Sequence, residues 1–150
     1  MYIYVDEALT YNKPKNADTF RSAGQSFGRF MKLLADYPAE TLNETIVNFH
    51  YTPARYENFL KAVQADVKGR KALCEEEIRF VTDRKEDTHK LTDLIASGDL
   101  PLRVTHNDTK LNNVLFDVNT DKSICVIDLD TIMPGLSLYD FGDSIRSGAN

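Results

Sequence analysis

Apolar residues recur at helical spacing along most of the first hundred positions. Between residues 17 and 36 they follow one another at steps of three and four, which places them on one face of a helix. Asn16 or Asp18 is suited to cap the start of this helix, and Pro38 follows its end. The shared apolar face comprises Phe20, Ala23, Phe27, Met31 and Leu34.

The same spacing predicts two more helical stretches. One begins after Pro53, and the other runs from about residue 70 to residue 97 with one break. Gly98 is placed to cap the end of the second stretch. The expected core positions of this stretch are Leu73, Ile78, Val81, Leu91, Leu94 and Ile95.

Short β-like segments dominate the rest of the pattern. Residues 2–5 have the aromatic and β-branched character of a strand, and residues 102–105, 114–116 and 123–128 are similar. Turn-forming residues at 119–122 predict a hairpin between the last two segments. A final helix is expected over 138–147. The fold class is therefore α+β, mostly helical, with a small β-hairpin and functional loops.

Composition narrows the possible functions. The chain has 150 residues, a net charge of -5 and a hydrophobic fraction of 42%, which is typical of one folded domain. This acidic balance disfavours general nucleic-acid binding. The longest apolar run, Met1 to Val5, is too short to span a membrane and lacks the features of a signal peptide. Two isolated cysteines, Cys74 and Cys125, predict a reducing, cytoplasmic location.

Chemistry-bearing residues concentrate between residues 103 and 130. A polar loop with two flanking β-like segments contains Asp108, Lys110 and Asn113, and Asp128 and Asp130 follow a second apolar strand. Carboxylate and amide oxygens at strand ends suit a hard cation such as Mg²⁺. A lysine two positions after the first carboxylate suits a phosphoryl group, whose negative charge must be neutralised.

These residues carry a resemblance to a known superfamily. The pattern His106-x-Asp108-x-Lys110-x-x-Asn113, with Asp128 after it, resembles the catalytic and metal-binding segments of protein-kinase-like phosphotransferases. The sequence around these residues is most similar to that of the aminoglycoside phosphotransferase and choline kinase superfamily. The segments 105–108, 127–131 and 139–143 look closest to N-acetylhexosamine 1-kinases.

The resemblance implies a role for each residue. Asp108 would act as the base toward a sugar hydroxyl, and Lys110 would offset charge on the transferred phosphoryl group. Asn113 and Asp128 would hold Mg²⁺ on the phosphates of ATP. His106 would brace the loop internally, whereas Asp130 receives no definite role.

Asp140-Phe141-Gly142 spells the metal-binding motif of protein kinases, but its position argues against that role. Asp140 lies well beyond the distance from Asp108 that a short hairpin allows, whereas Asp128 ends a hydrophobic strand at a suitable spacing. We therefore expect Asp140 to begin the last helix and to hydrogen-bond the loop from below, supporting the site.

The chain also lacks features that a complete kinase needs. Its seven glycines form no Gly-rich nucleotide loop. We therefore expect a partial C-terminal lobe, with residues 1–12 as a hinge and strand, 17–98 as a helical part and 102–150 carrying the loops. On this expectation an N-terminal nucleotide lobe and the remaining C-terminal part are absent, and the isolated fragment is inactive or nearly so.

Alternatives remain open at this level. The same base would serve choline, homoserine or an aminoglycoside as acceptor, and a kinase-like module without catalysis is also compatible with the pattern. A haloacid-dehalogenase-like phosphatase is disfavoured because Ile132 occupies the position where its motif requires Thr or Val. The expected partners are ATP and a small sugar, with no nucleic acid and no membrane.

Overall fold

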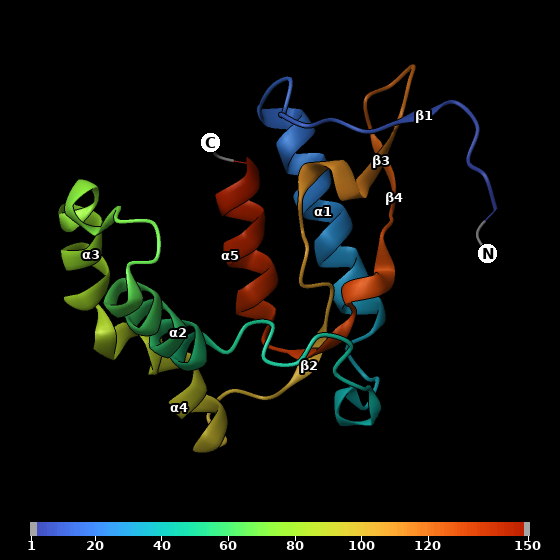
Figure 1. The fold of residues 1–150 in the computed structure, drawn as a ribbon. Coiled ribbons are helices and arrows are strands. Elements are labelled where there is room, and N and C mark those ends of the chain that lie inside the picture. The colour runs from blue at the N-terminus through green and yellow to red at the C-terminus, as the bar shows by residue number, and fades with distance from the viewer. Residues whose placement is uncertain (1–2, 149–150) are drawn as a thin grey trace. The chain divides into compact units, whose positions relative to one another are not determined.

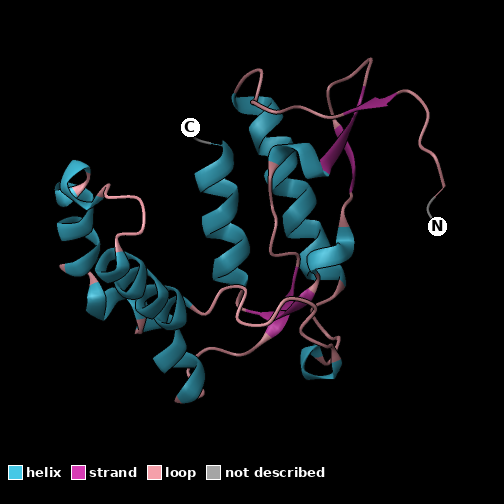
Figure 2. Ribbon diagram, in the orientation of Figure 1, coloured by secondary structure: helices cyan, strands magenta, loops and turns pink. Residues whose placement is uncertain are grey.

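The chain forms two units, one of which is assembled from two separate stretches of the sequence. A computed structural model describes residues 3–148 (Figures 1 and 2). The site unit comprises Met1–Ile46 and Leu102–Asn150, and the helical unit comprises Val47–Pro101. Helices and small antiparallel sheets together make the class α+β, as the sequence predicts.

The first long helix, α1, spans Ala17–Leu33 in the site unit. The amide of Thr19 donates to Asn16 Oδ1 at 2.9 Å, so Asn16 is the capping residue. Asp18 instead pairs with Arg21 one turn later. The helix buries the face that the apolar spacing predicts, and this face packs on the sheet. In the described part of the chain, no helix has the length and apolar character needed to cross a membrane.

Three antiparallel strands lie against α1 in the order β1-β3-β4. They are β1 (Ala8–Leu9), β3 (Val114–Asp117) and β4 (Ser123–Val126), and the predicted hairpin is β3 with β4. The strand expected at residues 2–5 is wrong over 3–5, and residue 2 lies outside the described residues. Ile3 and Tyr4 are exposed, because the pairing with β3 is made by β1 instead.

A two-stranded sheet in the site unit leads into its last helix. Strands β2 (Arg103–Thr105) and β5 (Met133–Gly135) are antiparallel, and α5 (Ser137–Gly148) follows directly. Helix α5 contacts both β2 and α1. The chain therefore returns to the start of the polar loop after making the β3–β4 hairpin.

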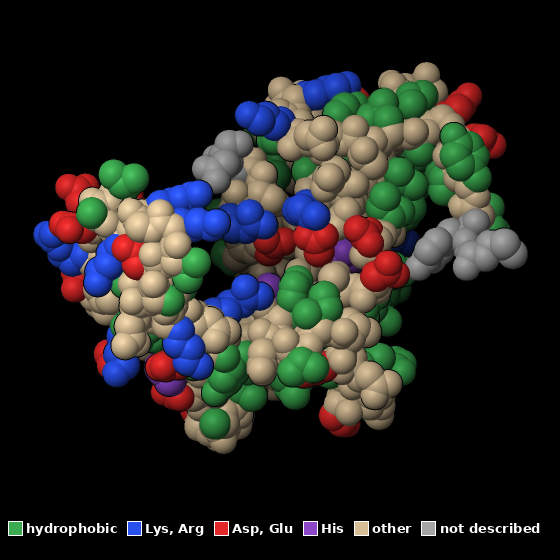
Figure 3. All heavy atoms as spheres, in the orientation of Figure 1, with side chains coloured by type: hydrophobic (Ala, Val, Ile, Leu, Met, Phe, Trp, Pro, Cys, Tyr) green, Lys and Arg blue, Asp and Glu red, His purple; other side chains and the backbone are tan. Residues whose placement is uncertain are grey.

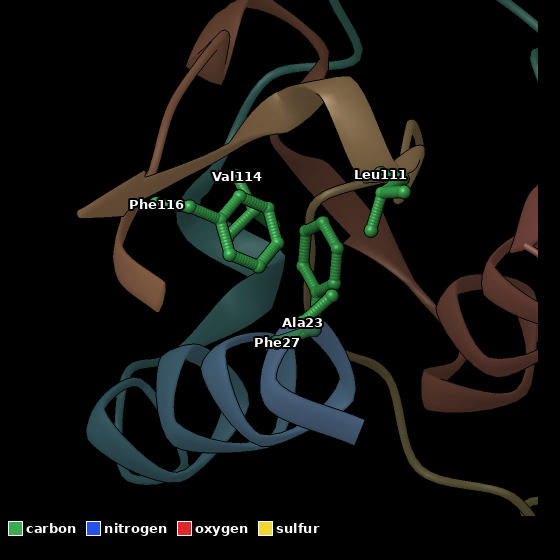
Figure 4. Close-up of a cluster of buried hydrophobic side chains, with 5 residues drawn as sticks. All are labelled: Ala23, Phe27, Leu111, Val114 and Phe116. Atoms are coloured by element: carbon green, nitrogen blue, oxygen red, sulfur yellow. The ribbon is translucent and has the colours of Figure 1, made fainter. Parts of the chain in front are cut away.

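The hydrophobic core of the site unit lies between α1 and the hairpin. Figure 4 shows Phe27 of α1 and the side chains of Val114 and Phe116 of β3 pointing toward one another. Leu111, from the polar loop itself, completes this cluster and is buried. One end of the loop is thus fixed by hydrophobic packing.

The helical unit contains α2 (Thr52–Ala65), α3 (Glu75–Thr82) and α4 (Lys90–Ala96). The stretch predicted over 70–97 is interrupted by 3₁₀ turns at Lys71–Leu73 and Lys85–Thr88, so a single break was too few. Its expected core residues are all at least partly exposed, because α3 and α4 are too short to bury a continuous face. Gly98 has a φ of 81° after α4, which is the left-handed cap that the sequence predicts.

Gly135 provides a test of the packing between β2, β5 and α5. A Cβ at this position would overlap Thr105 Oγ1 and press on Tyr139, so we expect Gly135→Ala to lower the free energy of unfolding by about 1–3 kcal/mol. Gly142 of α5 has open space around its Cβ position, so Gly142→Ala is expected to raise stability by about 0.5–1 kcal/mol. Denaturant unfolding measures both variants, and equal effects would contradict this packing.

Candidate functional site

A polar loop, residues 106–113, connects β2 to β3 in the site unit. Its backbone amide and carbonyl groups form hydrogen bonds with the end of the hairpin and with the start of α5. The N–H of Ile127 donates to the carbonyl of Asn113 at 2.9 Å, which extends the β3–β4 pairing by one step. This bond brings Asn113 beside the residue that immediately precedes Asp128.

Asp140 is buried beneath the polar loop, near the start of α5. Its carboxylate accepts the backbone N–H of His106 at 2.9 Å and that of Asn107 at 2.7 Å. The hydroxyl of Thr109 donates to the backbone carbonyl of Asp140 at 2.7 Å. Two hydrogen bonds to one carboxylate compensate its burial and hold the loop backbone at a defined position.

His106 is fully buried at the start of the loop. Its Nε2 lies 2.9 Å from the carbonyl oxygen of Ile127, and because a carbonyl can only accept, Nε2 is the donor. The edges of Phe27 and Phe30 pack against the ring at centroid distances of 5.5 and 5.7 Å. The ring therefore joins the loop to the segment that ends in Asp128.

Asn107 was not singled out by the sequence pattern, although it holds the turn of the loop. Its φ is 66°, a left-handed conformation in which Asn is one of the tolerated residues. Its Nδ2 donates to the carbonyls of Thr105 at 3.2 Å and Thr131 at 2.9 Å. The Thr131 hydroxyl donates in turn to the carbonyl of His106 at 2.6 Å. An Asn, a residue type that tolerates the left-handed conformation, was the sequence signal that could have identified this position.

Asp108, Lys110 and Asn113 lie together on the loop, where Asp108 and Lys110 are half-buried and Asn113 is buried. Asn113 Nδ2 donates to Asp108 Oδ2 at 3.0 Å and to the Asp108 carbonyl at 2.8 Å. Lys110 Nζ pairs with Asp108 Oδ2 at 2.8 Å. The Asp108 side chain is 24% exposed, so its carboxylate is held in place yet open to a ligand.

Other carboxylates surround Lys110 besides its partner. The hydrogen bond that Lys110 donates to Asp108 raises the pKa of Lys110. The charges of Asp108, Asp128 and Asp143 act in the same direction, whereas partial burial of the lysine acts against them. Asp128 and Asp143 therefore lie near enough for their charges to act on Lys110. Figure 3 shows acidic side chains gathered on one face with Lys and Arg side chains beside them.

Asp128 stands at the end of the hairpin in a left-handed conformation, with a φ of 61°. A non-glycine residue in this region is uncommon and is held there by its surroundings. Its side chain is exposed, beside the residues that contact His106 and Asn113. Asp130 is also exposed, and its backbone carbonyl accepts the hydroxyl of Thr45 at 3.2 Å.

Asp143 lies in the segment 139–143, and the sequence predicts no role for it. It lies one turn after Asp140 on α5, and its side chain is only 13% exposed. Arg146 pairs with it through Nη2 at 2.6 Å and Nε at 3.1 Å. The pKa of Arg146 is raised by Asp143 and, through space, by Asp108. The i, i+3 spacing from Asp140 was the signal that could have revealed Asp143.

The donor set fits a magnesium ion that is shared with a bound phosphate. Asn113 directs its amide nitrogen to Asp108, and its amide oxygen together with the Asp128 carboxylate would supply hard oxygen ligands to such an ion. Within residues 3–148 no three His, Cys, Asp or Glu side chains could enclose a metal by themselves. Mg²⁺ commonly takes only one or two protein carboxylates, with phosphates and water completing its shell.

This arrangement combines three chemical capacities in one place. The Asp108 carboxylate can accept a proton from a hydroxyl, and Lys110 beside it can neutralise a developing negative charge. Asn113 and Asp128 offer oxygen atoms to a cation. Asp140 and His106 contact only the protein, from below and within the loop.

A protein-family model matches nearly the whole chain. The model of the phosphotransferase enzyme family matches residues 4–150. The matched range includes the polar loop, the β3–β4 hairpin and α5, as well as the whole helical unit.

The contacts of Asp140 lead to a stability prediction. Replacing Asp140 with Asn turns an amide NH₂ toward one of the two loop N–H groups, so we expect a loss of about 1.5–3 kcal/mol in unfolding free energy. Hydrogen exchange at the amides of His106 and Asn107 should accelerate at the same time. The exposed Asp36→Asn is the matched control and should change stability by less than about 0.5 kcal/mol. Unchanged exchange at both amides would refute the anchoring role.

The ion pair of Lys110 leads to a prediction about pH. Because Asp108 raises the pKa of Lys110, the pair contributes fully below the ordinary pKa of lysine and loses its effect as the pH rises through the raised value. An NMR titration of the Lys110 side chain should show this elevation. Asp108→Asn should lower the Lys110 pKa, and Asp36→Asn should leave it unchanged. A Lys110 pKa that does not respond to Asp108→Asn would contradict the pairing.

Proposed function

Because the chain belongs to the phosphotransferase enzyme family, we propose that it transfers the terminal phosphate of ATP to a hydroxyl group of a small molecule. The observation that carries this proposal is the grouping of Asp108, Lys110 and Asn113 on a buried support. A family of phosphotransferases requires such a grouping of base and cation beside the phosphate.

In the proposed reaction Asp108 is the general base. Its carboxylate accepts the proton of the acceptor hydroxyl as the oxygen bonds to the γ-phosphorus, and the bond from that phosphorus to the ADP oxygen breaks. Lys110, which the carboxylates keep protonated, faces the negative charge of the transferred group. Asn113 keeps the Asp108 carboxylate oriented through its amide N–H.

Mg²⁺ and ATP are the proposed cofactor and co-substrate. Asn113 and Asp128 are the residues that would hold the ion, and the ion would neutralise charge on the nucleotide phosphates. The bond between His106 and the carbonyl of Ile127 supports this assignment, because it sets the start of the loop relative to the Asp128 segment. We propose His106 and Asp140 as positioning residues, and Asp130 keeps no assigned role.

The proposed acceptor is an N-acetylhexosamine, phosphorylated on its anomeric hydroxyl. This choice is supported by the resemblance of residues 127–131 and 139–143 to the N-acetylhexosamine 1-kinases, and it is more specific than the loop chemistry. The structure adds that both segments meet the loop, since Thr131 and Asp140 hydrogen-bond its backbone. A cytoplasmic location is part of the same proposal, because the cell supplies ATP there.

The test is an assay with Mg-ATP and a panel of N-acetylhexosamines, choline, homoserine and an aminoglycoside. The assay uses the protein at its natural termini. We expect ADP only with the sugars, and Asp108→Asn should lower kcat by about 10²–10⁴-fold because the general base is lost. Asp36→Asn, which is remote from the loop, should keep the wild-type rate.

Each result decides a separate part of the proposal. ADP formed only with choline, homoserine or an aminoglycoside would keep the mechanism and reject the sugar. Full activity in Asp108→Asn would reject the assignment of the base. A folded protein that binds Mg-ATP but phosphorylates none of these acceptors would favour the non-catalytic alternative.

A further inference from the structure

A polar pocket in the site unit lies beside the Lys110–Asp108 ion pair. Its volume is about 410 Å³, and three separate segments of the chain contribute its cations. Lys13 comes from the segment before α1, Lys110 from the polar loop and Arg146 from α5. Asn12, Asn112 and Ser147 add amide and hydroxyl groups to the wall.

The charge of this pocket is opposite to that of the chain as a whole. Its described lining has three cationic side chains and no carboxylate, whereas the chain carries a net charge of -5. Converging cations with neutral hydrogen-bond donors suit an anion with several oxygen atoms. Attraction of such an anion must come from these side chains, because the overall charge of the chain repels it.

Carboxylates outside the pocket hold two of the three cations. Asp108 pairs with Lys110 at 2.8 Å, and Asp143 pairs with Arg146 at 2.6 Å. Neither carboxylate lines the pocket. The pairs therefore hold Lys110 and Arg146 beside the pocket, and an anion bound there would compete with Asp108 and Asp143 for them.

We propose that this pocket binds the phosphate group of a phosphate monoester, the class of product that the proposed transfer would release. Lys110 is shared between the two places, since it pairs with Asp108 and also lines the pocket. A phosphate on the acceptor oxygen thus has a neighbouring cationic site that needs no metal ion. This inference rests on the proposed function for its choice of ligand, and the pocket itself is defined by the structure alone.

Binding is measured by NMR on the full chain, without nucleotide or metal. The probes are inorganic phosphate and a sugar 1-phosphate, with ADP in a separate arm. Both phosphate probes should shift the signals of Lys13, Lys110 and Arg146. Lys13→Gln and Arg146→Gln should each raise the Kd by roughly three- to fivefold, as expected for partly exposed charge pairs. Raising the salt concentration should weaken binding in every case.

Lys122→Gln is the matched control, because Lys122 lies in the hairpin turn outside the pocket and the variant removes the same charge. It should keep the wild-type Kd. Equal weakening in Lys122→Gln and Lys13→Gln would show a general charge effect and overturn the proposal. If the signals of these residues shift with ADP but with neither phosphate probe, the proposal is also overturned, because the pocket would then bind the nucleotide.

Asp108→Asn separates this inference from the proposed function. The variant is expected to lose phosphoryl transfer, yet it should bind inorganic phosphate as tightly as wild type or more tightly, since Lys110 loses a competing carboxylate. Phosphate binding without any transfer in the wild type would reject the function and keep the pocket. Transfer without phosphate binding would reject the pocket alone.

Discussion

The site depends on one buried carboxylate. Asp140 accepts two consecutive backbone N–H groups of the polar loop, from residues 33 and 34 positions earlier in the chain. Without these bonds the loop amides would be buried without partners, which costs more than an ordinary hydrogen bond contributes. The carboxylate also fixes the start of α5, which carries Asp143 and Arg146 one and two turns later. Loop and helix are therefore positioned by the same contact.

Opposite charges meet in a defined order around this anchor. Asp108, Asp128 and Asp143 act on Lys110, which keeps the lysine protonated. Arg146 and Lys13 line the polar pocket together with Lys110. The carboxylates around Lys110 thus lie beside the cations that line the pocket. On the proposed function, a cation held by the carboxylates and a phosphate held by the cationic side chains would occupy neighbouring positions.

Local patterns predicted the elements whose signals lie within a few residues. The helix capped by Asn16 and the β3–β4 hairpin follow from apolar spacing and turn chemistry, and both are present. The strand expected at residues 2–5 failed over 3–5 because pairing depends on a partner, and β3 pairs with Ala8 and Leu9 instead. The helices expected over 70–97 are present as α3 and α4, but the residues expected in their core are at least partly exposed, since helical spacing does not show whether neighbouring elements cover the apolar face.

The sequence by itself determined the chemical content of the site: the loop with Asp108, Lys110 and Asn113, and a second carboxylate at a strand end. Residue type and close spacing are sufficient for that inference. Tertiary structure alone decided which distant groups join them, because Asp143, Arg146 and Lys13 approach the loop only when α5 and the segment before α1 pack beside it. Long-range packing sets these distances, and no local pattern encodes them.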